Sequence, residues 1–90
     1  MNEFTVIWML DSLGELANIW IDAPDREAVN LAVSRIDSQL AKNPTEKGEH
    51  VAEGLRKLPE PPLSVLFSVR EADRIVEIDK VLVDWTESER

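Results

Sequence analysis

The chain has 90 residues, 43% of them apolar, and no cysteine, and its 18 acidic and 10 basic side chains give a net charge of −8. This composition is typical of one small globular domain, and it excludes disulfides, thiolate metal sites and cysteine nucleophiles. Because neutralising nucleic-acid phosphates needs clustered Lys and Arg, the acidic balance disfavours direct nucleic-acid binding; it favours a basic protein partner or simple solubility.

The chain start indicates a cytoplasmic location. It carries neither the basic segment nor the cleavable apolar stretch of a signal peptide. The longest nearly apolar run, residues 4–10, is too short to cross a bilayer, so no membrane association is expected. We expect one domain over residues 1–90, with a frayed tail over residues 85–90.

The first half predicts a strand followed by two helices. Residues 4–10 form the strand, and we expect it inside the sheet because both of its faces are largely apolar. Ser12 and Glu15 have the spacing of a capping box. Apolar residues recurring every three or four positions predict helices over 12–21 and 25–42, which form an αα-hairpin.

A polar loop over residues 43–50 separates the helices from the remaining strands. The next strand is predicted over residues 51–58. The Pro-rich residues 59–62 are predicted to form a connection, because proline cannot donate the hydrogen bonds of a sheet ladder.

Two further strands complete the predicted sheet. Residues 63–70 alternate in polarity as a strand does, and residues 71–74 form a hairpin turn. The last strand begins at residue 75, and its apolar alternation changes phase at Asp79. We interpret this change as a β-bulge or a change of face near Asp79.

The order βααβββ, together with several local segments, resembles the RelE/ParE toxin superfamily of type II toxin–antitoxin modules, which includes plasmid-stabilisation-type toxins. The resemblance covers about residues 3–85 and implies an α+β fold, with an αα-hairpin packed on a small, mostly antiparallel sheet. The segments that carry it are Trp8, residues 23–26 and 36–40, Asn43, Pro44, Gly48, and residues 54–58, 62–69 and 73–74.

The same resemblance implies a function in macromolecular binding. In this superfamily the concave sheet face is the working surface. One branch uses it to cut messenger RNA on the ribosome, and the other poisons DNA gyrase. Both are neutralised by a cognate antitoxin whose C-terminal segment wraps around the toxin, so an antitoxin is the expected partner.

The residues that RNA-cleaving members use are largely missing. Those members place basic residues on strand two, an arginine early in strand three, and Arg, His or Tyr late in strand four. Here Lys57 matches the first position with Arg56 beside it, Ser64 occupies the second, and residues 81–83 at the third are apolar. Cleavage needs a proton acceptor and cations at the scissile phosphate. A gyrase-type or other non-nuclease role is therefore favoured.

Two alternatives stay open. The first is a ribosome-dependent mRNA endonuclease, with Arg56, Lys57 and His50 as weak catalytic candidates; it requires these residues and Lys47 to gather on one concave face. The second is a catalytically inert interaction domain or a decayed toxin.

Four side chains are candidate partner contacts: Arg56, Lys57, Arg70 and Trp85. Arg56 and Lys57 are consecutive in a strand, so they face opposite sides of the sheet, and each is otherwise a solvated charge. Arg70 is expected to pair with a nearby acid, and Trp85 either caps the core or anchors a partner.

The other sites have plainer interpretations. His50 in the polar loop is either a general base or an exposed bystander. Trp8 and Trp20 fall on core stripes and are expected to pack there. We expect no cofactor and no metal, because one histidine and scattered acids do not form a ligand set. The chain is expected to be a monomer or a homodimer.

Overall fold

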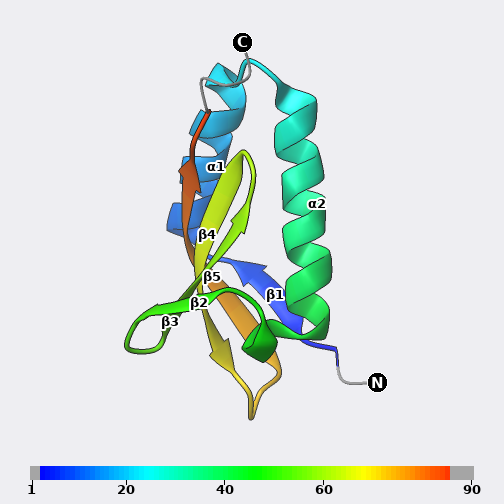
Figure 1. Ribbon diagram of the computed structural model, residues 1–90, viewed down its shortest axis with the longest axis vertical. Coiled ribbons are helices and arrows are strands. Elements are labelled where there is room, and N and C mark those ends of the chain that lie inside the picture. Colours follow the sequence, from blue (N-terminus) through cyan, green and yellow to red (C-terminus); the bar gives the residue numbers. More distant parts are fainter. Residues whose placement is uncertain (1–2, 86–90) are drawn as a thin grey trace.

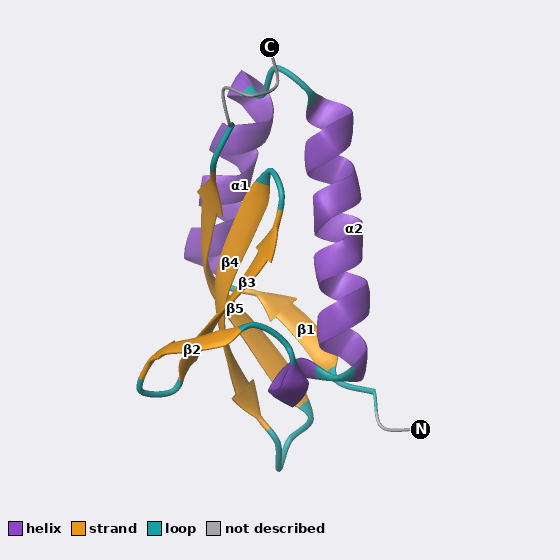
Figure 2. Cartoon of the chain, viewed as in Figure 1, coloured by secondary structure: helices purple, strands orange, loops and turns teal. Residues whose placement is uncertain are grey.

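The computed structural model describes residues 3–85, and in it two helices precede most of a five-stranded sheet (Figures 1 and 2). The sheet order is β1-β5-β4-β3-β2; β1 pairs with β5 in parallel, and the other pairs are antiparallel. The predicted α+β class and helix-hairpin arrangement are confirmed. The elements are β1 (Thr5–Trp8), α1 (Leu10–Asp22), α2 (Arg26–Lys42), the 3-10 helix η1 (Pro44–Glu46), β2 (Glu49–Ala52), β3 (Leu55–Glu60), β4 (Leu63–Arg70) and β5 (Ile75–Val83).

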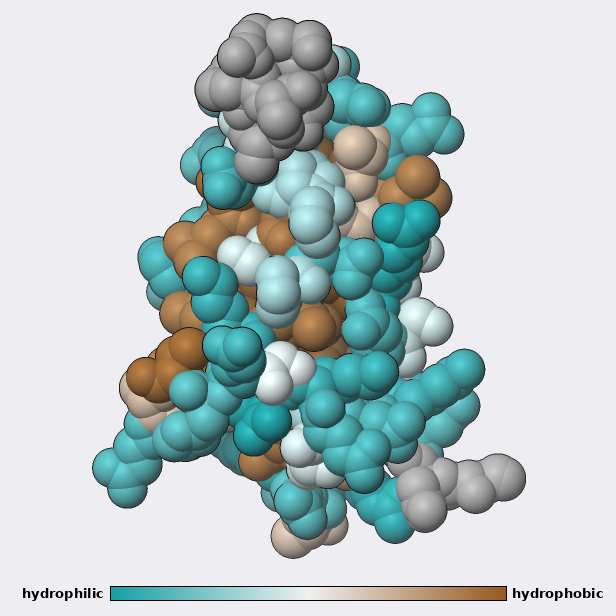
Figure 3. All heavy atoms as spheres, viewed as in Figure 1, coloured by the Kyte–Doolittle hydropathy of each residue, from teal (hydrophilic) through white to brown (hydrophobic). Residues whose placement is uncertain are grey.

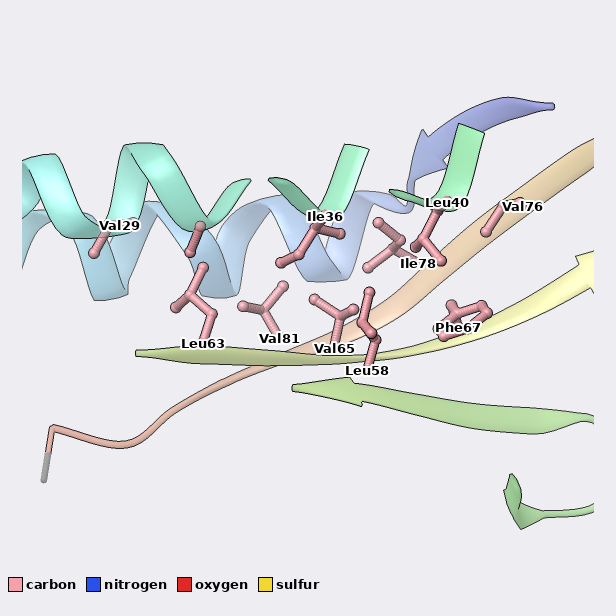
Figure 4. Close-up of a cluster of buried hydrophobic side chains, with 11 residues drawn as sticks. Val29, Ile36, Leu40, Leu58, Leu63, Val65, Phe67, Val76, Ile78 and Val81 are labelled. Atoms are coloured by element: carbon pink, nitrogen blue, oxygen red, sulfur yellow. The ribbon is translucent and has the colours of Figure 1, made fainter. Parts of the chain in front are cut away.

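The core lies between α2 and the sheet. One apolar stripe of α2 is buried. It packs on the strand side chains that point to the helix side of the sheet (Figure 4). Each fully buried Leu, Ile or Phe contributes roughly 1.5–3 kcal/mol to folding. The buried apolar residues are Val29, Ala32, Ile36, Leu40, Leu58, Leu63, Val65, Phe67, Val76, Ile78 and Val81.

Polar contacts fix α2 at its start and to β1. The Asp25 carboxylate accepts from the Ala28 amide at 3.1 Å and caps the helix. The Trp8 indole nitrogen donates to Asp37 Oδ1 at 2.8 Å, which ties β1 to α2. The sequence-based interpretation of Trp8 as a packing residue is confirmed, because its ring also packs against the core.

The predicted bulge lies at Asp79. Leu66 pairs with Lys80 and Phe67 with Ile78, so Asp79 is an extra residue in β5. The bulge keeps Ile78 and Val81 on the same buried face although they are three positions apart. Desolvation, and then the Glu77 carboxylate, raise the pKa of Asp79 above its ordinary value.

Helix α1 contacts the part of the β5 edge that extends beyond the end of β1. The β1 ladder ends where the Met9 amide donates to the Ile78 carbonyl at 3.0 Å. Further along, Glu15 Oε1 accepts from the Val81 amide at 2.8 Å, and Glu15 Oε2 lies 3.0 Å from Lys80 Nζ. The Val81 hydrogen bond, and then Lys80, hold the pKa of Glu15 below its ordinary value.

Two expectations for the N-terminal region are wrong. The first strand is shorter than residues 4–10 and lies at an edge of the sheet, with Ile7 39% exposed. The capping box does not form, because the helix starts earlier, with Met9 at its N-cap. The Ser12 hydroxyl instead donates to the Met9 carbonyl, and Glu15 is engaged by β5.

The strand predicted over residues 51–58 is in fact the β2–β3 hairpin. Gly54 has φ +77° and forms the turn, so the chain reverses where a continuous strand was expected. Pro59 and Glu60, predicted to lie in the connection, extend β3 instead. Proline is tolerated there because Pro59 lies past the last residue of β3 that pairs with β2.

The remaining strand predictions are confirmed. Residues 63–70 form β4, residues 71–74 form the turn, and the last strand starts at Ile75. The polar loop is shorter than residues 43–50, because Glu49 and His50 belong to β2. The predicted frayed tail falls mainly on residues 86–90, outside the described residues.

Of the three glycines, Gly48 is the one whose surroundings leave no room for a side chain. Its φ is +73°, and a Cβ would collide with the Lys57 carbonyl, whose carbon would lie at 2.9 Å. We expect Gly48→Ala to lower the free energy of unfolding by about 2 kcal/mol or more, because strain and a clash coincide. Urea denaturation measures this change. Gly54→Ala is the matched control: φ is +77°, no atom lies within 4 Å, and only about 1 kcal/mol is expected. Equal losses would contradict the role given to the Lys57 contact.

Removing the Glu15 carboxylate tests how α1 is held. We expect Glu15→Ala to lower the free energy of unfolding by about 1 kcal/mol at neutral pH, because the Val81 amide loses its acceptor. Glu15→Gln keeps an acceptor oxygen and should cost less.

The stabilisation that Glu15 provides should decrease as the pH falls. Since folding lowers the Glu15 pKa, its contribution is present above the ordinary glutamate value and lost as the pH falls through the folded value. Denaturation of both variants at a series of pH values should show the Glu15→Ala difference shrinking in acid. A difference that grows in acid would contradict this assignment.

Candidate functional site

The two cations predicted on the second strand face opposite sides of the sheet. Arg56 pairs across the ladder with Phe67, which is buried beneath the helices, so Arg56 lies on the helix side. Lys57 pairs with Leu66 and is exposed on the other side. The expected opposition of the pair is confirmed, and the two residues do not form one catalytic centre.

Arg56 holds the loop that enters β2. Its Nε donates to the Lys47 carbonyl at 2.9 Å, and its Nη2 donates to the Gly48 carbonyl at 3.3 Å. The backbone carbonyl of Lys47, rather than its amine, therefore meets Arg56. These bonds give Arg56 a structural role, whatever else it binds.

A polar hollow of about 310 Å³ lies beside this loop. His50 belongs to β2 and not to a loop as expected, and it is the ladder partner of Arg56. The hollow is lined by Thr45, His50, Gly54, Arg56, Val69 and Glu71. The nuclease alternative requires Arg56, Lys57, His50 and Lys47 on one face. Of these, His50 and Arg56 both line the hollow, and Lys57 lies on the opposite face of the sheet.

The other two candidate contacts, Arg70 and Trp85, each contact other residues of the chain. Arg70 Nη2 lies 3.1 Å from Glu77 Oε2, the ion pair expected for it. Trp85 is partly buried and packs against the core, which favours the capping interpretation over an exposed anchor. Ser64 pairs with Leu82 on the face turned away from the helices.

A second concave feature, an apolar groove of about 370 Å³, runs between α1 and α2. Its walls leave large apolar side chains in contact with water: Leu13 is 46% exposed, Trp20 39% and Ile21 60%. Apolar surface also shows between polar side chains on the face in Figure 3. The groove is lined by Leu13, Leu16, Ala17, Trp20, Ile21, Val29, Asn30 and Val33.

The Trp20 side chain is held rigidly as a groove wall. Its Nε1 donates to Asn30 Oδ1 at 3.2 Å, and the Arg26 guanidinium carbon lies 4.6 Å from its ring centroid. Arg26 also donates to the carbonyls of Trp20 and Ile21, so it caps the end of α1. The expectation that Trp20 packs in the core is wrong, because α1 turns this side of its stripe toward the groove.

The helix segments that form the groove carry more acids than bases. Helix α1 carries Asp11, Glu15 and Asp22 but no Lys or Arg. The start of α2 adds Asp25 and Glu27 together with Arg26, which lies over the Trp20 ring, and Glu15 is turned to β5. An apolar groove between helix segments with an excess of acids suits an amphipathic segment that carries basic residues beside its apolar face.

Sequence reasoning missed this groove. Its signal is the excess of apolar residues on α1, where Leu10, Leu13 and Ile21 lie outside a single buried stripe. Leu10 is 82% exposed, more than any other large apolar residue in the described part of the chain. An amphipathic pattern that is too wide for one interface therefore indicates a second one.

The described residues form neither a metal cluster nor a membrane-spanning helix. Within residues 3–85, no group of three or more His, Asp or Glu side chains is placed to hold a metal ion. Neither of the two described helices combines the length and apolar character needed to span a membrane.

Comparisons with known proteins find similarity only in structure. No protein-family model matches the sequence, and no curated protein matches it. A chain from the toxin–antitoxin complex RelBE2 of Mycobacterium tuberculosis superposes with a TM-score of 0.78 at 14% identity, covering 93% of this chain and 94% of that one.

Two further solved structures are similar to this chain over most of its length. A chain from the chromosomal ParDE system of P. aeruginosa has a TM-score of 0.65 at 18% identity, covering 93% of this chain and 99% of that one. A chain from the archaeal RelE–RelB complex of Pyrococcus horikoshii OT3 has a TM-score of 0.66 at 15% identity, covering 92% and 97%. The chain thus has the RelE/ParE fold, as its resemblance to that superfamily implied.

Proposed function

We propose that this chain is a RelE/ParE-like toxin-family protein of a type II toxin–antitoxin module. It acts in the cytoplasm by binding other macromolecules and is neutralised by a cognate antitoxin. The observation that carries the proposal is the apolar groove between α1 and α2, on a fold shared with chains from three toxin–antitoxin structures.

The antitoxin segment that fits the groove is a basic amphipathic helix. Leu13, Trp20 and Ile21 provide an apolar surface already shaped by the fold, so binding costs little reorganisation. A helix of the partner that buries these three side chains places the residues beside its apolar face near the acids of α1. Complementary charge then speeds association and fixes the orientation of the helix.

A gyrase-type or other non-nuclease target is favoured over RNA cleavage. The cations that cleavage requires are divided between the two faces of the sheet, since Arg56 faces the helix side and Lys57 the other. Ser64 stands at the family position of the strand-three arginine. Arg56 is further committed to the Lys47 and Gly48 carbonyls.

One observation favours the nuclease alternative. The polar hollow gathers a guanidinium, an imidazole and a carboxylate from Arg56, His50 and Glu71. These are groups that can hold a phosphate and move a proton. The inert interaction domain remains the third possibility, and growth experiments distinguish it from the other two.

Groove substitutions test the antitoxin interface. The chain is co-expressed with the product of the neighbouring gene in its source genome, and the affinity of the purified pair is measured by calorimetry. Ile21→Asp places a charge in the groove, and we expect at least about a tenfold loss of affinity. Leu31→Asp is the control, because Leu31 is 49% exposed on α2 and does not line the groove.

Equal affinity for the two variants would contradict the assignment of the groove. If the neighbouring product does not bind the unaltered chain, the antitoxin proposal itself is overturned. Circular dichroism of both variants verifies that the helices are intact.

The cellular target is tested with purified protein in two parallel assays. We expect inhibition of gyrase supercoiling and no ribosome-dependent mRNA cleavage. Arg56→Ala/Lys57→Ala is the control for the cleavage assay. Cleavage that disappears in this double variant would overturn the favoured target and support the nuclease alternative. Growth unaffected by expression, with neither assay positive, would favour the inert domain.

A further inference from the structure

The polar hollow beside the 3-10 helix is separate from the α1–α2 groove, and the two share no lining residue. Segments far apart in sequence build it: Thr45 comes from η1, His50 from β2, Arg56 from β3, and Val69 and Glu71 from the end of β4 and its turn. At about 310 Å³ it accommodates a small organic molecule.

The arginine in the hollow is oriented before any ligand arrives. Two backbone carbonyls, of Lys47 and Gly48, engage Nε and Nη2 of Arg56. Among the described residues, no protein group accepts a hydrogen bond from the remaining nitrogen, Nη1. A guanidinium fixed on one side and open on the other is suited to an oxyanion, because its geometry needs no further ordering.

Two further donors accompany Arg56. His50 lies directly across the β2–β3 ladder from it, so both side chains leave the sheet on the same face. Thr45 contributes a hydroxyl to the lining. The turn residue Gly54, which has no side chain, leaves room for a ligand to approach the hairpin.

Glu71 limits which anion can enter. A carboxylate on the rim repels an anion of high charge unless the ligand brings a donor that the carboxylate can accept. Val69 lines the same hollow and offers an apolar contact to an organic substituent. We infer that the hollow binds the phosphate group of a small phosphate monoester that also carries an amine donor for Glu71.

This inference does not depend on the antitoxin proposal, and its probe is different. Phosphoethanolamine is titrated into the isotope-labelled chain, and the backbone amide signals of Thr45, His50, Arg56 and Glu71 are followed by NMR. Inorganic phosphate, ethanolamine and sodium chloride at matched ionic strength are titrated separately. We expect saturable shifts with phosphoethanolamine, weaker binding of inorganic phosphate, and no saturation with ethanolamine or chloride.

Variants that leave the Arg56 hydrogen bonds intact test the assignment. Thr45→Val and His50→Ala should each weaken phosphoethanolamine binding about threefold, because each removes one donor. Glu71→Gln should strengthen inorganic phosphate binding about threefold and reduce the preference for phosphoethanolamine. Thermal unfolding verifies that each variant is folded.

Three results would overturn the inference. Two are shifts that chloride reproduces at the same ionic strength, and phosphoethanolamine affinities unchanged in Thr45→Val and His50→Ala. Tighter binding of inorganic phosphate than of phosphoethanolamine would remove the role given to Glu71, and with it the proposed ligand class.

Discussion

The length mismatch between β1 and β5 determines how α1 sits in this fold. β1 has four residues and pairs only with the first part of the nine-residue β5. Beyond the bulge at Asp79, the edge of β5 has no neighbouring strand, and a backbone amide left there needs an acceptor. Glu15 supplies it for Val81, so α1 lies along the sheet edge.

The groove follows from that placement. Helix α2 supplies the fully buried helical side of the core, with Ile36 and Leu40 on the sheet, while α1 buries mainly Leu16 and Ile19 in part. Apolar residues on the rest of α1 then face α2 or water. Exposed apolar side chains of this kind do not stabilise an isolated domain. Their exposure is explained if a partner covers the groove. The charged residues of α1 are all acids, which favours a partner segment with basic residues.

Much of the fold could be predicted from local pattern. Helix α2 carries a regular apolar stripe and a cap at Asp25, and β4 alternates cleanly over residues 63–70. The phase change at Asp79 located the bulge because burial on one face requires side chains to alternate. These elements are specified by residues close together in sequence.

The errors arise where distant residues decide the structure. Ser12 and Glu15 match a capping box, but the Val81 amide and Lys80 take up the carboxylate. Residues 51–58 match a strand, but Gly54 reverses the chain and sets His50 opposite Arg56. The hollow and the groove depend on these tertiary arrangements, so sequence pattern alone could name Arg56 and His50 without showing that they meet.

The most direct test of the account is the structure of this chain in complex with the product of its neighbouring gene. The account predicts a basic amphipathic helix in the groove between α1 and α2, with Trp20 and Ile21 buried by its apolar face. A partner that binds elsewhere and leaves Trp20 and Ile21 as exposed as they are in the free chain would contradict it.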